Sequence, residues 1–142
     1  MTVARIIEGR RATILTCGVS DSVRDAVALL SDRRIGALPV LEAGAVAGIF
    51  SERDLIYKLR EYGPDVLDRQ VGEVMTAPAV TVAPETEVLA ALSLMTKRRI
   101  RHLPVVQGTE MVGFISIGDL VKYRIDQVES EAQAMLAYIQ TA

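Results

Sequence analysis

Apolar and polar residues follow helical spacing in some parts of the chain and strand spacing in others. Helical spacing predicts a short helix over 2–8, and a run of β-branched and apolar residues predicts a strand over 13–17. The next helix has one apolar face, and we expect Ser20 or Asp21 to cap its start and Gly36 to end it. The N-terminal part therefore predicts helix, strand and helix in that order.

Two more strands and a helix complete this pattern. Apolar runs at 38–41 and 45–50 flank a turn at 42–44, which is typical of a β-hairpin. A helix over 51–62 follows directly, and the Gly-Pro pair at 63–64 ends it. After the N-terminal helix, the first half of the chain thus predicts a strand-helix-strand-strand-helix unit.

The same unit occurs a second time. Residues 31–59 and 96–124 align without a gap and are identical at 10 of 29 positions. After a connection at 64–75 with a helical turn at 71–75, the second copy predicts a strand over 80–82, a helix over 84–99, a strand over 103–106, a turn at 107–109 and a strand over 111–115. Such a repeat indicates a duplicated α+β fold.

The last helix is longer than its counterpart in the first unit and is predicted to run to about residue 138. Its apolar positions step by four and three residues, which is the spacing of a seam between two helices: Val121, Ile125, Val128, Ala132, Met135 and Ile139. We expect this stripe to contact a second copy across a homodimer. The alternative is that it packs back on its own domain.

Composition narrows the function classes. Half of the 142 residues are apolar, which is enough for a buried core. The net charge of −2 argues against a nucleic-acid binder and a membrane-surface protein. A single cysteine, Cys17, and a single histidine, His102, cannot assemble a zinc site. The sequence has no signal-peptide pattern or apolar run long enough to cross a membrane, and we expect a cytoplasmic protein.

Each unit carries a serine followed three residues later by an aspartate at the start of its last helix, Ser51 with Asp54 and Ser116 with Asp119. One interpretation is a capping box, in which each side chain binds a free backbone N–H of the other residue. The other is a ligand site, since a helix N-terminus suits a phosphate and a carboxylate can accept hydrogen bonds from the two hydroxyls of a ribose. The phosphate-loop, dinucleotide, serine-hydrolase and metalloprotease motifs are absent from the sequence, so we expect no enzyme.

Leu-Pro-Val followed by Gly-x-x-Ser-x-x-Asp-Leu, present twice, resembles the cystathionine β-synthase (CBS) domain pair. The resemblance covers the chain to about Arg124 and is strongest to small stand-alone bacterial proteins made of one such pair. It implies two pseudo-symmetric β-α-β-β-α units packed sheet to sheet as a Bateman module, which usually dimerises, with adenosine nucleotides bound in two clefts. The implied division is 1–63 for the first unit, 64–75 for the linker, 76–126 for the second unit and 127–142 for the helical extension.

The resemblance also implies which residues bind, since each cleft takes its ribose side from one unit and its adenine side from the other. One site would combine Ile49, Ser51, Arg53 and Asp54 with Pro78, Val80, Ile100, Arg101 and His102. The other would combine Phe114, Ser116 and Asp119 with Thr13, Leu15, Ile35, Gly36 and Ala37.

The two sites are not expected to be equivalent. Arg53, Arg101 and His102 lie near the phosphate position of the first, whereas glycine and alanine occupy the matching positions of the second: Gly36, Ala37 and Gly118. A hydrogen bond to a charged group contributes about 1.5 to 3 kcal/mol. We therefore expect the Asp54 site to bind more tightly, and the Asp119 site to hold a dinucleotide or nothing.

The leading hypothesis is a homodimeric sensor of AMP, ADP, ATP or an NAD-type ligand that reports energy or redox state to an unknown regulated protein, with no catalytic cofactor. A ligand-free oligomerisation scaffold is the main alternative, and a detached regulatory subunit of a catalytic partner is a third. A regulatory role requires that the ligand bind two conformations with different affinity, because equal affinity shifts no equilibrium.

Overall fold

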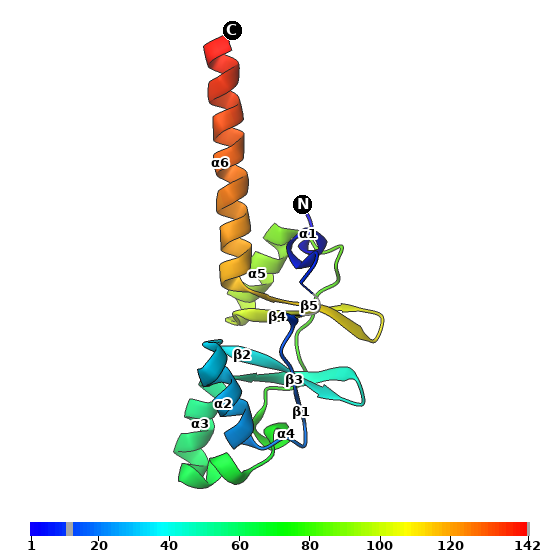
Figure 1. Ribbon diagram of the computed structural model, residues 1–142, viewed down its shortest axis with the longest axis vertical. Helices are drawn as coiled ribbons and strands as arrows, with labels where there is room; N and C mark the ends of the chain where they lie inside the picture. Colours follow the sequence, from blue (N-terminus) through cyan, green and yellow to red (C-terminus); the bar gives the residue numbers. More distant parts are fainter. Residues whose placement is uncertain (11–12, 142) are drawn as a thin grey trace.

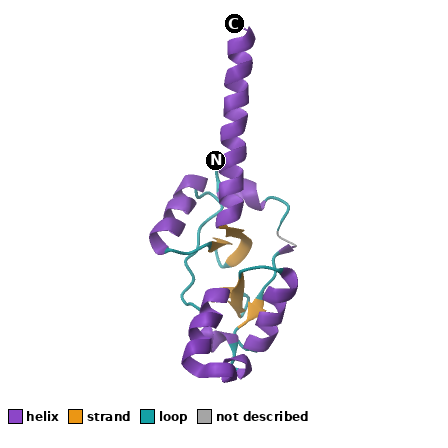
Figure 2. Ribbon diagram, turned by 90° about the vertical axis from the view of Figure 1, so that its left-hand side faces the viewer, coloured by secondary structure: helices purple, strands orange, loops and turns teal. Residues whose placement is uncertain are grey.

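The computed structural model describes residues 1–10 and 13–141. It consists of two α+β units stacked along the long axis, with the C-terminal helix projecting from the upper unit (Figure 1, Figure 2). The first elements are α1 (Val3–Ile7), β1 (Cys17–Gly18), α2 (Val23–Arg33), β2 (Ala37–Glu42), β3 (Ala45–Ser51) and α3 (Glu52–Tyr62). A 3-10 helix (Gly63–Asp68), α4 (Val71–Val74), α5 (Val88–Arg98), β4 (His102–Gln107), β5 (Glu110–Ser116) and α6 (Ile117–Thr141) follow.

The predicted duplication and the α+β fold are confirmed by the strand pairing. Among the described residues, β1, β2 and β3 form one sheet, and β4 and β5 form another. Both hairpins are antiparallel and carry a register irregularity at the same place, after Val40 in the first and after Val105 in the second. The two strand-to-helix junctions therefore have equivalent positions in the two units.

Two predicted strands are shorter than expected. The strand over 13–17 is reduced to Cys17–Gly18, which pairs with Val40 and Leu41. The ladder cannot continue backward, because the next residue of β2 is Pro39, which has no N–H to donate. The predicted strand over 80–82 is reduced further, because this segment forms an isolated β-bridge between Val82 and Val105.

Three predicted helix ends are also wrong. Ser22, and not Ser20 or Asp21, caps α2, since its hydroxyl accepts a hydrogen bond from the Asp25 N–H at 3.1 Å. The helix ends because Arg34 adopts a left-handed φ of 52°, before Gly36 is reached. In the second unit, α5 begins at Val88 instead of at residue 84, because residues 83–86 form a turn in which the Thr86 hydroxyl accepts from the Ala83 N–H at 3.2 Å.

The described apolar residues form two separate cores. The first surrounds Phe50 and Leu38, and it includes three residues that follow α3: Val66, Val71 and Val74. The second surrounds Met95 and Leu103, and it includes Val3 and Ile6 of α1. Packing therefore differs from the predicted division in two places, since α1 belongs with the second unit and the 64–75 connection packs on the first.

The strands β3 and β5 lie where the two units face each other (Figure 1). The connection to the second unit passes close to β3, because Ile49 and Thr76 exchange two backbone hydrogen bonds of 2.9 Å. A Cβ atom on Gly48 would lie 2.6 Å from the Thr76 carbonyl oxygen. This approach requires glycine. In the part of the chain that the structure describes, no helix combines the length and hydropathy needed to cross a bilayer.

We predict that Gly48→Ala lowers the free energy of unfolding by about 1 to 3 kcal/mol, because the added methyl group overpacks against backbone that cannot yield. The matched control is Gly118→Ala in the first turn of α6, where a Cβ atom would meet nothing closer than the Ser116 hydroxyl at 3.6 Å. Urea unfolding measures both variants. An equal midpoint for Gly48→Ala and the wild type would contradict this packing.

Candidate functional site

Residues from both units line two neighbouring cavities in the described part of the chain. The Asp54 cavity measures about 620 Å³ and lies at the start of α3, facing the segment 76–80 and residues 99–102. The Asp119 cavity measures about 390 Å³ and lies at the start of α6, facing residues 13–15 and 34–37. Gly36 and His102 line both, so the two cavities share a wall.

The structure brings the predicted residues together in the two expected groups. All nine predicted residues of the first site line the Asp54 cavity: Ile49, Ser51, Arg53, Asp54, Pro78, Val80, Ile100, Arg101 and His102. All eight of the second line the Asp119 cavity: Thr13, Leu15, Ile35, Gly36, Ala37, Phe114, Ser116 and Asp119. Their grouping is a structural finding, while their binding role stays a prediction.

The junction between β3 and α3 positions the Asp54 carboxylate. Ser51 caps α3, and its hydroxyl accepts from the Asp54 N–H at 3.3 Å, while Asp54 Oδ2 accepts from the Ser51 N–H at 2.9 Å. The capping box is therefore present. Because Asp54 lines the cavity and is not buried, the capping role and a ligand role are compatible in one side chain.

Thr76 contributes a further contact to Asp54. Its hydroxyl donates a 2.7 Å hydrogen bond to Asp54 Oδ1, the oxygen that does not bind the Ser51 backbone. Since Thr76 also pairs with Ile49 through its backbone, this contact ties the carboxylate to the second strand of the hairpin. No sequence motif pointed to Thr76, because its approach depends on the glycine at position 48.

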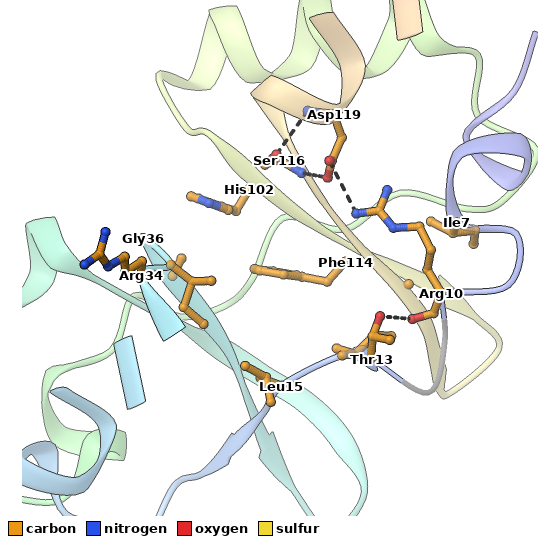
Figure 3. Close-up of a pocket in the computed structure, with 14 residues that line it drawn as sticks. Ile7, Arg10, Thr13, Leu15, Arg34, Gly36, His102, Phe114, Ser116 and Asp119 are labelled. Atoms are coloured by element: carbon orange, nitrogen blue, oxygen red, sulfur yellow. Dashed lines mark hydrogen bonds and ion pairs between the residues drawn. The ribbon is translucent and has the colours of Figure 1, made fainter. Parts of the chain in front are cut away.

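The Asp119 junction repeats the cap with a different partner (Figure 3). Asp119 Oδ2 accepts from the Ser116 N–H at 2.9 Å, and the Ser116 hydroxyl accepts from the Asp119 N–H at 3.1 Å. Asp119 Oδ1 forms an ion pair with Arg10 at 3.3 Å, and the two side chains are 27% and 47% exposed. A cation thus stands where the first cavity has the neutral Thr76 hydroxyl.

The distribution of cations corrects one expectation. The Asp119 cavity was expected to lack positive charge, but Arg10 and Arg34 line it. Arg10 follows α1, which packs on the second unit, and Arg34 is the left-handed residue that ends α2. Arg10 lies outside the aligned repeat, whereas Arg34 aligns with Arg99, which lines the other cavity, so comparison of the two units indicates Arg34 but not Arg10.

The Asp54 cavity is also lined by a cationic and an aromatic side chain that the sequence analysis did not identify. Arg53 donates a 3.2 Å hydrogen bond to the Arg99 carbonyl, and Arg99 lines the cavity beside Arg101. Tyr57 adds an exposed aromatic ring at the mouth. Tyr57 could have been identified from the sequence, because a residue three positions after Asp54 lies on the same helix face.

His102 lies between the two cavities. Its ring stacks on Phe114, with centroids 5.6 Å apart and planes 11° apart. Burial lowers the pKa of His102, the carboxylates of Asp119 and Glu52 act in the opposite direction, and Arg101 lowers the pKa further. A neutral imidazole in the ligand-free protein can therefore gain a proton when an anion binds beside it.

The groups that line these cavities favour binding over bond chemistry. Apolar walls, helix N-termini, carboxylates and arginines are the elements of a site for a flat ring with an anionic tail. The described residues include no group of three His, Cys, Asp or Glu side chains that could hold a metal. Cys17 lies outside both cavities, and burial raises the pKa of its thiol to about 11.

Comparison with known proteins places this geometry in a family. The CBS domain model matches residues 10–61 and 71–126. The CBS domain-containing mitochondrial protein CBSX3 of Arabidopsis thaliana is 42% identical over 131 residues, which cover 89% of this chain and 64% of that protein. A putative signal-transduction protein with CBS domains from Burkholderia ambifaria has a solved structure that is 40% identical, with a TM-score of 0.80, over 89% of this chain and 95% of that one.

A solved structure of CBSX2 in complex with AMP is 26% identical, with a TM-score of 0.77, over 90% of this chain and 98% of that one. The chain thus spans less than two thirds of CBSX3 but nearly all of both solved structures. Each stretch matched by the family model contains one of the two Ser-x-x-Asp junctions that line a cavity, Ser51 with Asp54 in the first and Ser116 with Asp119 in the second. The chain belongs to the CBS domain family, with two CBS units in tandem.

Proposed function

We propose that this protein is a regulatory module that binds adenosine nucleotides in the cavities between its units. The observation that carries the proposal is the duplicated junction, in which a capping aspartate faces a cavity with apolar and cationic walls. Both cavity volumes fall within the range of about 300 to 1,000 Å³ that is usual for small-molecule sites. The AMP bound by the related CBSX2 is a ligand of the chemistry that these walls suit.

In the proposed complex, the ribose hydroxyls donate to lone pairs of Asp54 that its capping bonds leave open. The purine lies between Ile49, Val80 and Ile100, and the phosphate lies near Arg53 and Arg101. Aliphatic side chains are sufficient for the faces of a purine, while backbone groups can bind its edge. These roles follow the resemblance to the family, residue by residue, and the placement of the side chains supports them.

The Asp54 site is proposed to bind more tightly than the Asp119 site. The Asp119 carboxylate already has an ion pair with Arg10, and a ribose would have to compete with that contact. Asp54 instead accepts from the neutral Thr76 hydroxyl, and its cavity is the larger one. The bound phosphate would meet three arginines there: Arg53, Arg99 and Arg101.

Regulation would follow from the position of the cavities between the units. A ligand that contacts both units favours one relative position of the two, and only such a differential affinity can shift a conformational equilibrium. AMP, ADP, ATP and NAD-type ligands are all compatible with an adenosine site. The protein that responds to the conformational change is proposed to be a separate regulated protein. The exposed stripe on α6 favours the second candidate, an assembly scaffold with empty cavities.

Thermal unfolding with millimolar AMP, ATP or NADH separates these candidates. We expect at least one of the three to stabilise the protein, by about 2.7 kcal/mol when its concentration is 100 times the dissociation constant. Ribose 5-phosphate at the same concentration controls for the effect of charge without adenine. If none of the adenosine compounds raises the unfolding temperature above this control, nucleotide binding is contradicted and the assembly scaffold is the candidate function that is left.

A pair of substitutions tests the ribose contact. We predict that Asp54→Ala weakens binding of the stabilising nucleotide at least tenfold, because about 1.5 to 3 kcal/mol is lost with a hydrogen bond to a charged group. Asp119→Ala is the matched control: it removes an equivalent cap, which costs ~1 kcal/mol of stability, but is expected to affect the affinity less. Isothermal titration calorimetry measures both.

Equal losses of affinity in these two variants would contradict the predicted ranking of the sites. Unfolding of ligand-free Asp54→Ala would show that the carboxylate serves mainly as a cap.

His102 should make nucleotide affinity depend on pH. Its pKa is lowered in the ligand-free protein, and a bound phosphate raises it again, so the complex takes up protons. We therefore expect affinity to increase as the pH falls from 7.5 through the usual histidine pKa of about 6.5. The measurement is the dissociation constant at several pH values in the wild type and in His102→Gln, which has no titrating side chain.

The nucleotide phosphate titrates near pH 6 and contributes the same slope to both proteins. Parallel pH profiles for the wild type and His102→Gln would rule out this role for the imidazole.

A further inference from the structure

Helix α6 leaves the globular part of the protein and continues without support from its own chain. Leu120 is its buried residue, and every side chain from residue 128 to 141 is exposed. At 1.5 Å per residue this free part is about 21 Å long, and Figure 1 shows it projecting away from both units. An unsupported helix of such length is marginal in water, which indicates that something packs against it.

The apolar stripe of α6 shows which face is packed. Five of its six members are large, with exposed fractions between 42% and 67%: Val121, Ile125, Val128, Met135 and Ile139. The sixth, Ala132, is exposed as well. Packing of this stripe on its own domain, the alternative left open by the sequence, is therefore wrong. The four-and-three spacing fits a two-helix seam, with Ile125 at an a position and Val128 at a d position.

Charges beside the stripe indicate what the partner is. Lys122 and Glu129 lie seven residues apart on one side of it, at e positions, and Arg124 and Glu131 lie seven residues apart on the other side, at g positions. Each side thus carries a cation followed by an anion. In an antiparallel helix pair, like sides face each other, so the sequence of charges on α6 is complementary to itself.

We propose that a second copy of this chain packs antiparallel against α6, with the twofold axis between Ile125 and Val128. Lys122 then faces Glu129 of the partner subunit, and Arg124 faces Glu131 of the partner subunit. In the apolar layers, Ile125 packs on Val128 of the partner subunit. The proposal is independent of nucleotide binding, since none of these residues lines a cavity.

Two competing arrangements satisfy the charges less well. An antiparallel register that pairs all six apolar positions would place Glu129 opposite Glu129 of the partner subunit, and Glu131 likewise opposite its own copy. A parallel pair would match Arg124 with Glu129 of the partner subunit but leave Lys122 and Glu131 without opposite charge. The proposed register also sets the long Met135 side chain opposite Gly118 of the partner subunit, where the missing side chain leaves room.

The first test concerns the apolar seam. Sedimentation equilibrium of the full chain should show a dimer, and Val128→Asp should raise the dimer dissociation constant about 100-fold or more, since it places a charge in each of two central layers. The matched control is Ser130→Asp, which adds the same charge on the opposite face of α6 and should leave the dimer intact. Neither residue belongs to a core, so both variants should retain the unfolding temperature of the globular part.

The second test concerns the orientation. Glu129→Lys turns two attractive contacts into repulsive ones and should weaken the dimer about tenfold. Adding Lys122→Glu should restore it in the antiparallel pair, because the reversed charges face each other again. Adding Arg124→Glu should restore it only in a parallel pair.

A monomeric wild type at about 100 µM, or a Val128→Asp variant that remains dimeric, would overturn the proposal. Rescue by Arg124→Glu instead of Lys122→Glu would overturn its antiparallel geometry.

Discussion

The hydrogen bonds between the serine and the aspartate at each strand-to-helix junction are the interaction on which the rest of the structure depends. At Ser51 and Asp54 they satisfy backbone N–H groups at the start of α3, and they fix one carboxylate oxygen against the backbone. The other oxygen accepts a hydrogen bond from the Thr76 hydroxyl, and both residues line the cavity. Because the same capping hydrogen bonds recur at Ser116 and Asp119, each unit places one capped aspartate beside a cavity.

One difference between the cavities lies outside the repeated unit. The Asp54 oxygen outside the cap accepts a hydrogen bond from the neutral hydroxyl of Thr76, whereas the corresponding oxygen of Asp119 forms an ion pair with the guanidinium of Arg10. A carboxylate that already has a cationic partner gains less from a neutral donor than one that does not. The two carboxylates therefore differ through segments outside the repeat, in addition to positions inside it where an arginine of one unit matches a glycine of the other, such as Arg53 and Gly118.

The distinction between residues inside and outside the repeated unit also explains how much of the fold and of the cavities could be predicted from the sequence. The repeat and the hairpins follow from local patterns, and the seventeen cavity residues named from the sequence follow from the resemblance to the family, because all of them belong to the duplicated units. The contributions of Thr76 and Arg10 could not be predicted in this way. Each depends on a close approach between segments far apart in the chain, since Thr76 pairs with Ile49 beside Gly48 and Arg10 forms an ion pair with Asp119.

Helix α6 joins the two surfaces of the protein that remain to be filled. Its first turn contains Asp119, which faces the smaller cavity, and Val121, the first member of the exposed stripe, follows only one turn into the helix. A helix transmits displacement along its axis because its hydrogen bonds resist bending. A ligand that separated Asp119 from Arg10 would act on the same continuous helix that carries the stripe, so the smaller cavity and the exposed stripe share one element.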